Sequence, residues 1–111
     1  INICHTDLET STLWPFYNQT FDVVLVTNYL FRPRLIELFS LIRASGYLVY
    51  ETFAEGNAVY GKPRNINYLL VKGELLQILP KDFEVVDYFH GKVDQPKPSI
   101  IQRMAAKKNG N

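Results

Sequence analysis

Polar side chains follow short apolar segments at three places in the chain, and these are the side chains best suited to chemistry. They occupy residues 5–9, 27–29 and 51–53 and include carboxylates, hydroxyls, an imidazole and an amide. Groups of this kind move protons, orient a substrate or hold a cofactor. Because open parallel sheets bind ligands beyond the carboxyl ends of their strands, we expect a site at that edge. The alternative is that the strands simply end where polarity begins.

A strand, a helix and a second strand are predicted to position two of these segments. Residues 21–27 form a β-branched apolar run, which is typical of a strand buried on both faces. Residues 33–43 carry a broad apolar stripe with Pro33 in the first turn, which predicts a helix. Gly46 follows the helix, where a left-handed stop is favourable, and residues 47–51 form the next predicted strand. This βαβ order predicts a parallel pair with a right-handed crossover.

The rest of the chain predicts a loop, a short helix and two antiparallel strands. Residues 53–71 lack periodicity and contain several Gly and Asn, which is typical of a functional loop or lid. Residues 72–79 predict a helix, and residues 83–90 and 99–106 predict two strands joined too closely for a helical crossover. Residues 1–4 predict a strand with no obvious neighbour. The predicted architecture is a three-layer α/β half-sheet, a parallel βαβ unit followed by an antiparallel β-hairpin.

Composition and charge restrict the class of protein. The chain has 111 residues, of which 47% are hydrophobic and 21% charged, and this is typical of one globular domain. A formal net charge of +1 gives no reason to expect a nucleic acid or a membrane surface as partner. The single cysteine, Cys4, excludes an internal disulfide, and the widely separated His5 and His90 predict no metal site. Short apolar stretches and the lack of a signal-peptide pattern favour a cytoplasmic location.

Four segments, in order, resemble consecutive pieces of class I S-adenosylmethionine-dependent methyltransferases. They are the acidic turn at residues 7–9, the Trp-Pro-Phe segment at 14–16, the strand with its polar end at 21–30, and the strand at 44–53. The last helix and the hairpin look like that family's final elements. The Glu-Thr-Phe ending at 51–53 and the Asn-rich loop after it are most similar to the tellurite-resistance-like subgroup. The resemblance implies a Rossmann-like sheet and S-adenosylmethionine as cofactor.

The resemblance also implies that part of the family's domain lies outside this chain. The family's glycine-rich turn, and the acidic residue that holds the ribose, come before the segments present here. Residues 1–106 would form a single partial methyltransferase domain, a fragment that binds cofactor poorly, and residues 107–111 a flexible tail. In the family's sheet, two further strands separate those that correspond to residues 1–4 and 21–27. Without them the strand at 21–27 would expose an edge, which favours a homodimer.

By resemblance, five residues correspond to the cofactor and methyl-transfer site. Asp7 would accept a hydrogen bond from the adenine amino group while Leu8 packs on the ring. Thr27 and Asn28 would line the methionine moiety, and Tyr29 would place an aromatic face near the cationic sulfur. Methyl transfer is an in-line displacement, so such residues mainly align the groups and exclude water. The alternatives are a solvated helix-capping aspartate and a tyrosine that merely begins the connection to the helix.

Glu51 is the candidate general base, because proton removal often accompanies methylation of oxygen or nitrogen. Its alternative is a strand-end carboxylate that caps the next segment. Residues 56–62 match the phosphate-loop pattern G-x-x-x-x-G-K, but Pro63 offers neither the hydroxyl nor the N–H that such a loop needs next. Lys62 and Arg64 instead predict either a lid that attracts an anionic acceptor or a solvated loop.

Two functions of different classes therefore stay open. Methyl transfer to a small-molecule acceptor is favoured, because residues 28–30 do not match the Asn-Pro-Pro-aromatic signature of base and glutamine methylation. The alternative is a non-catalytic dimerisation or scaffold half-domain. A glycine-rich turn upstream of residue 1 would favour the enzyme.

Overall fold

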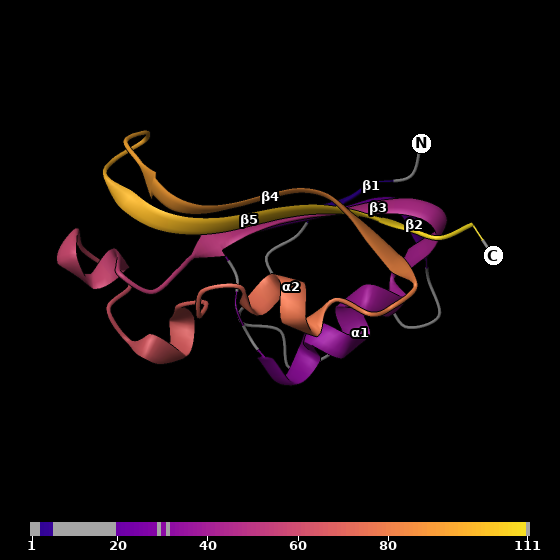
Figure 1. Cartoon of the computed structure of the whole chain (residues 1–111), viewed down its shortest axis with the longest axis horizontal. Coiled ribbons are helices and arrows are strands. Elements are labelled where there is room, and N and C mark those ends of the chain that lie inside the picture. The colour runs from indigo at the N-terminus through magenta and orange to yellow at the C-terminus, as the bar shows by residue number, and fades with distance from the viewer. Residues whose placement is uncertain (1–2, 6–19, 29, 31, 111) are drawn as a thin grey trace.

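One mixed sheet organises the molecule in the computed structural model, which describes residues 3–5, 20–28, 30 and 32–110. The strand order is β1-β2-β3-β5-β4, with β1, β2 and β3 parallel and the last two strands antiparallel (Figure 1). The strands are β1 (Ile3–His5), β2 (Phe21–Thr27), β3 (Ile42–Phe53), β4 (Phe83–Val93) and β5 (Ser99–Lys108). The predicted α/β class with a mixed sheet is confirmed.

The connection from β2 to β3 contains a shorter helix than the sequence predicts. A 3-10 turn (Arg32–Arg34) leads into α1 (Leu35–Ser40), and β3 begins at Ile42. The prediction of a helix as far as Arg43 is wrong because Leu41 is captured by the sheet: its carbonyl accepts the Phe21 N–H at 2.7 Å. Leu41 and Ile42 are both buried, so in the sequence they extend the apolar stripe of the helix, although Leu41 lies in the turn after α1 and Ile42 begins β3.

The left-handed residue predicted at Gly46 is instead Ser45, one residue earlier. Ser45 has the left-handed φ of 68°, and Gly46 lies within β3. A Cβ added at Gly46 would come within 2.9 Å of the carbonyl oxygens of Asp22 and Arg43. Glycine is therefore required here by the close approach of two backbone segments and not by its own torsion angle.

Helices and sheet pack as two layers in the described part of the chain. Helices α1 and α2 (Glu74–Ile78) lie on the same face of the sheet (Figure 1). Alternate strand residues point toward them and form the core with one side of each helix. The core includes Val24, Val26, Leu35, Leu38, Phe39, Leu48, Tyr50, Leu75 and Met104. The third layer of the predicted architecture is not confirmed. None of the described helices is long and apolar enough to cross a membrane.

The first strand has a neighbour, contrary to the prediction. Strand β1 pairs in parallel with β2, with Ile3 opposite Val23 and His5 opposite Leu25. The edge of β2 is therefore covered along these residues, where the sequence predicted an open edge. The physical reason is that unpaired strand N–H and C=O groups take any segment that can reach them in register.

The two C-terminal strands form the predicted antiparallel hairpin, and both are longer than predicted. Strand β5 runs through Lys108, and the Asn109 N–H donates to the Asp82 carbonyl at 2.7 Å. Residues 107–109 are thus part of the folded structure, and the prediction of a flexible tail is wrong for them. The register places Glu51 of β3 opposite Arg103 of β5.

The irregular stretch after β3 leaves the sheet and returns to it as a closed loop, residues 54–70. Ala54 and Leu70 form a parallel bridge, and the Glu55 N–H donates to the Leu70 carbonyl at 2.8 Å. Between them lie two short 3-10 turns, Asn57–Val59 and Ile66–Tyr68. The predicted helix at residues 72–79 is the shorter α2.

Candidate functional site

The carboxyl ends of β2 and β3 bring three of the six predicted site residues together. Thr27 lies opposite Glu51 in the parallel register, and the Asn28 N–H donates to the Glu51 carbonyl at 2.9 Å. Asn28 has a φ of 55°, a left-handed conformation that Asn tolerates better than most residues. This torsion turns the chain out of β2 at the strand end. The other three predicted site residues, Asp7, Leu8 and Tyr29, lie outside the described residues.

A groove opens on the side of this edge that faces the helices, and we call it the helix-side groove. Its inner part has a volume of about 190 Å³ and its outer part about 330 Å³, and the two parts share Leu30 and Tyr68. The inner part is lined by Asn28, Leu30, Thr52, Phe53, Pro63 and Tyr68, and the outer part by Leu30, Arg32, Pro33, Asn67 and Tyr68. The closed loop thus supplies one wall and the strand ends supply the other.

A second, smaller groove lies on the opposite side of the same edge, and we call it the hairpin-side groove. It has a volume of about 120 Å³. Its lining residues are Asn28, Glu51, Phe53, Val93, Gln95, Pro96, Lys97, Ser99 and Ile101. Because successive side chains of a strand point to opposite faces, Glu51 lines this groove while Thr52 lines the other. Figure 1 shows the closed loop and the β4–β5 turn on opposite sides of the end of β3.

Glu51 forms an ion pair that sequence reasoning did not find. Its Oε1 accepts a hydrogen bond from Arg103 Nε at 2.7 Å, and the two side chains are 35% and 42% exposed. The Arg103 guanidinium also lies 5.7 Å from the centre of the Phe89 ring. The partner is 52 residues away and is brought close only by the β3–β5 register. One carboxylate oxygen of Glu51 is therefore occupied, and its role as general base stays a prediction.

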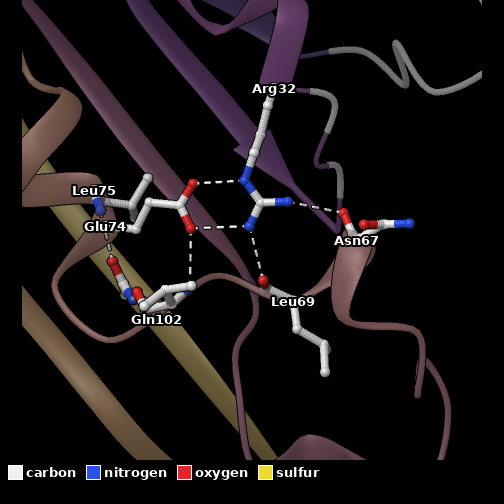
Figure 2. A network of polar contacts seen from close by, with 7 residues as sticks. Arg32, Asn67, Leu69, Glu74, Leu75 and Gln102 are labelled. Carbon is white, nitrogen blue, oxygen red and sulfur yellow. Dashed lines mark hydrogen bonds and ion pairs between the residues drawn. The ribbon is translucent and has the colours of Figure 1, made fainter.

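Arg32 fastens the closed loop to the helices (Figure 2). Its Nε and Nη2 donate to the two carboxylate oxygens of Glu74 at 2.7 and 2.9 Å. Its Nη1 donates to the Asn67 carbonyl at 3.0 Å, and Nη2 also donates to the Leu69 carbonyl at 2.9 Å. The hydrogen bond from Arg32 holds the pKa of Glu74 below its usual range, although burial acts in the opposite direction. The same bond raises the pKa of Arg32.

On β5, the buried side chain of Gln102 forms a second set of hydrogen bonds, close to those of Arg32. Its Oε1 accepts the Leu75 N–H at 2.9 Å, as Figure 2 shows, and its Nε2 donates to the Val71 carbonyl at 2.9 Å. Its Nε2 also lies 3.1 Å from His90 Nδ1. The polar atoms of a fully buried amide need hydrogen-bond partners. The hydrogen bonds of Gln102 meet this need and hold the start of α2 against the sheet.

Sequence reasoning missed Arg32, Glu74 and Gln102, and the signals for them differ. Gln102 interrupts an apolar strand, and such a residue needs a buried partner, so a structural role was inferable. Arg32 and Glu74 each stand at the beginning of a predicted helix, and nothing in the sequence shows that these two helix starts meet.

The G-x-x-x-x-G-K segment does not form a phosphate-binding loop. Its backbone N–H groups are used inside the closed loop: Asn57 donates to Ala54 and Val59 donates to Gly56. Lys62 and Arg64 are exposed, and neither lines the helix-side or the hairpin-side groove. Among the side chains that the structure describes, no three His, Cys, Asp or Glu gather as a metal site would require.

The described residues fit one part of a cofactor site. Thr27 and Asn28 are exposed at the strand ends, where a hydroxyl and an amide can bind the polar groups of an amino acid moiety. The adenosine part would depend on Asp7 and Leu8, which the structure does not describe.

Comparison with known proteins supports the fold. No protein-family model matches the chain, and no curated protein sequence does. The crystal structure of TehB from Haemophilus influenzae superposes with a TM-score of 0.63 at 16% identity, covering 82% of this chain and 36% of that one. A structure from work on the conversion of a disulfide bond into a thioacetal group during echinomycin biosynthesis has a TM-score of 0.60 at 7% identity. This second likeness covers 84% of this chain and 51% of that one. The chain thus has the fold of class I S-adenosylmethionine-dependent methyltransferases and spans about half or less of each neighbour.

Proposed function

We propose that this chain is the acceptor-side part of an S-adenosylmethionine-dependent methyltransferase that acts on a small molecule in the cytoplasm. The observation that carries the proposal is the meeting of Thr27, Asn28 and Glu51 at the carboxyl edge of two parallel strands, in this fold. A groove adjoins that edge on each side. Ligands of open parallel sheets bind at this edge because the strand ends leave polar groups there.

In this mechanism Thr27, Asn28 and Glu51 would each have a distinct role. Bound S-adenosylmethionine would supply the methyl group. Thr27 and Asn28 would hold the methionine moiety by its polar groups, so that the acceptor meets the methyl group in line. Glu51 would orient the acceptor or take its proton, and Arg103 is a positioning residue that fixes the Glu51 carboxylate. The closed loop would exclude water from the acceptor.

A non-catalytic dimerisation half-domain is the second candidate. Its support is the exposed apolar surface on the strands: Tyr47, Val85 and Phe89 are 42%, 42% and 37% exposed. A homodimer could cover these side chains or extend the sheet at its edge. Light scattering after size exclusion separates this candidate from a monomeric enzyme part.

Titration of S-adenosylhomocysteine into the ¹⁵N-labelled 111-residue chain tests the enzyme proposal. We expect weak binding, with a dissociation constant on the order of 1 mM, because the chain spans only part of its neighbours. The amide signals of Thr27, Asn28 and Glu51 should shift, while that of Glu84 at the far end of β4 should not. ATP is the matched control, since it contains adenosine without the methionine moiety. Equal shifts with ATP, or none at residues 27 and 28, would contradict the proposal.

A further inference from the structure

We propose that the helix-side groove binds an uncharged, flat acceptor molecule, a ring with a hydrogen-bonding substituent, held between the Tyr68 ring and the Thr52 hydroxyl. The inference rests on the proposed function only in calling this molecule the methyl acceptor. The groove and its ligand class follow from the lining side chains.

Thr52 provides the polar end of the groove. Its side chain is 2% exposed and lines the inner part, yet its hydroxyl has no hydrogen-bond partner among the described residues. Leaving a buried polar group without a partner is unfavourable, so few such groups occur in native proteins. A ligand hydroxyl, amine or carbonyl in the inner groove would supply the missing hydrogen bond. The Asn28 amide, which lines the same part, can bind a second polar atom.

Tyr68 provides the flat wall. It is half-exposed, at 51%, and lines both parts of the groove together with Leu30. The 3-10 turn that carries it is fixed by the two Arg32 hydrogen bonds to the Asn67 and Leu69 carbonyls. A rigid aromatic side chain held at a groove favours stacking with a planar ligand, since little side-chain entropy is lost on binding.

The charge of the described lining disfavours an anionic ligand. Arg32 is the charged side chain of this groove within the described residues, and its guanidinium is matched by the Glu74 carboxylate and two carbonyls. Lys62 and Arg64 flank the lining residue Pro63 but do not line the groove themselves. A carboxylate or phosphate would lose its hydration without gaining an opposite charge, which is strongly unfavourable. The anionic acceptor that Lys62 and Arg64 suggested in the sequence is therefore not favoured here.

The two parts of the groove also limit the size of the ligand. Pockets for small molecules usually enclose roughly 300–1,000 Å³, and the two parts together fall in the lower half of that range. One ring fits the inner part, and the outer part accommodates a substituent that extends toward Asn67. The ligand class is thus a small monocyclic or bicyclic compound.

The test uses phenol and benzoate as probes of equal ring size and different charge. The ¹⁵N-labelled chain is titrated with each, without S-adenosylhomocysteine. Phenol should shift the amide signals of Thr52 and Tyr68, and benzoate should bind at least about tenfold more weakly. Tyr68→Ala should weaken phenol binding about threefold to tenfold, which is the usual effect of one aromatic contact. Thr52→Val keeps the shape of the side chain but removes the hydroxyl, so it should also weaken phenol binding.

Tyr60→Ala is the matched control, because Tyr60 lies in the same closed loop, is 42% exposed and lines no described groove. It should leave phenol binding unchanged. Tyr68→Leu is a second variant that keeps the bulk of the side chain, so a loss shared with Tyr68→Ala reports the ring and not the fold. Tighter binding of benzoate, shifts at Glu51 and Lys97 instead, or no effect of Tyr68→Ala would overturn the inference. If phenol binds as expected but S-adenosylhomocysteine causes no shifts at Thr27 and Asn28, the groove would still be a binding site for a flat, uncharged ligand. Only the proposed methyl transfer would then be contradicted.

Discussion

The two grooves on either side of the β3 end share Asn28 and Phe53, yet they differ in charge and in the way they are held. The described side chains that line the helix-side groove are neutral or neutralised. Arg32 fastens its loop, and Gln102 holds the start of α2 directly after that loop. The hairpin-side groove contains Glu51 and Lys97, and its described ion pair is half-exposed. Glu51 and Thr52 are neighbours along β3, but their side chains point to opposite faces of the sheet, so one lines the hairpin-side groove and the other the helix-side groove.

This comparison predicts that the groove whose supporting polar side chains are more deeply buried is the more rigid one, whatever the number of its polar contacts. Gln102 is fully buried, Glu74 is 13% exposed, and Glu51 and Arg103 are both more than a third exposed. Water screens exposed charges and competes for their hydrogen bonds, so the expected contributions to stability fall in that order. Three substitutions test the order.

Gln102→Leu should have the largest effect. The leucine keeps the volume but leaves the Leu75 N–H and the Val71 carbonyl without their side-chain partner. We expect the free energy of unfolding to fall by about 3 kcal/mol, since each buried polar group left unpaired costs roughly 1–3 kcal/mol. Urea unfolding followed by circular dichroism measures the change.

Gln77→Leu on the exposed side of α2 is the matched control for this substitution. It makes the same chemical change where water can replace the amide, and its effect should stay within about 0.5 kcal/mol. If both variants lost the same stability, burial would not be the deciding property and the comparison of the grooves would fail.

The sequence predicted the sheet well where periodic patterns are local. Strand β2 was predicted with its observed bounds, and the antiparallel hairpin of β4 and β5 was predicted with both strands somewhat short. The helix end at residue 43 was missed because the apolar run of α1 continues without a break into β3. No local pattern could show that the Leu41 carbonyl accepts a hydrogen bond from the Phe21 N–H, which ends the helix.

Glu74→Gln should have the intermediate effect, and this effect should depend on pH. It replaces the carboxylate that pairs with Arg32 in two hydrogen bonds. We expect a loss of about 1–2 kcal/mol at pH 7, which is at or below the lower end of the range for charged hydrogen bonds, because Arg32 is 37% exposed.

The sign of the pH dependence follows from the lowered pKa of Glu74, caused first by the hydrogen bond from Arg32. Its stabilising contribution is complete above the unfolded-state pKa of about 4.3 and is lost as the pH falls through the lower folded-state pKa. The difference between wild type and Glu74→Gln should therefore shrink below about pH 4. Glu37→Gln on the exposed side of α1 is the control, and a difference for Glu74→Gln that stays constant from pH 7 to pH 3 would contradict the assignment.

The candidate site was only half predictable for a related reason. Thr27, Asn28 and Glu51 follow their strands directly, and the parallel register that brings them together could be inferred from the βαβ order. The partners Arg103 and Glu74 depend on contacts between segments 52 and 42 residues apart. The separation of Glu51 from Thr52 into two grooves depends on the closed loop, whose path has no periodicity in sequence.

The Glu51–Arg103 pair should have the smallest effect on stability, although it lies in the proposed site. A double-mutant cycle with Glu51→Gln, Arg103→Met and the combined variant isolates the coupling between the two side chains. With exposures of 35% and 42%, we expect a coupling of about 0.2–1 kcal/mol that decreases in 1 M salt. A coupling as large as the loss in Glu74→Gln, unchanged by salt, would show that the hairpin-side groove is held as firmly as the other. The rigid groove would then no longer be the preferred place for the acceptor, because both sides of the β3 end would offer an equally preorganised wall.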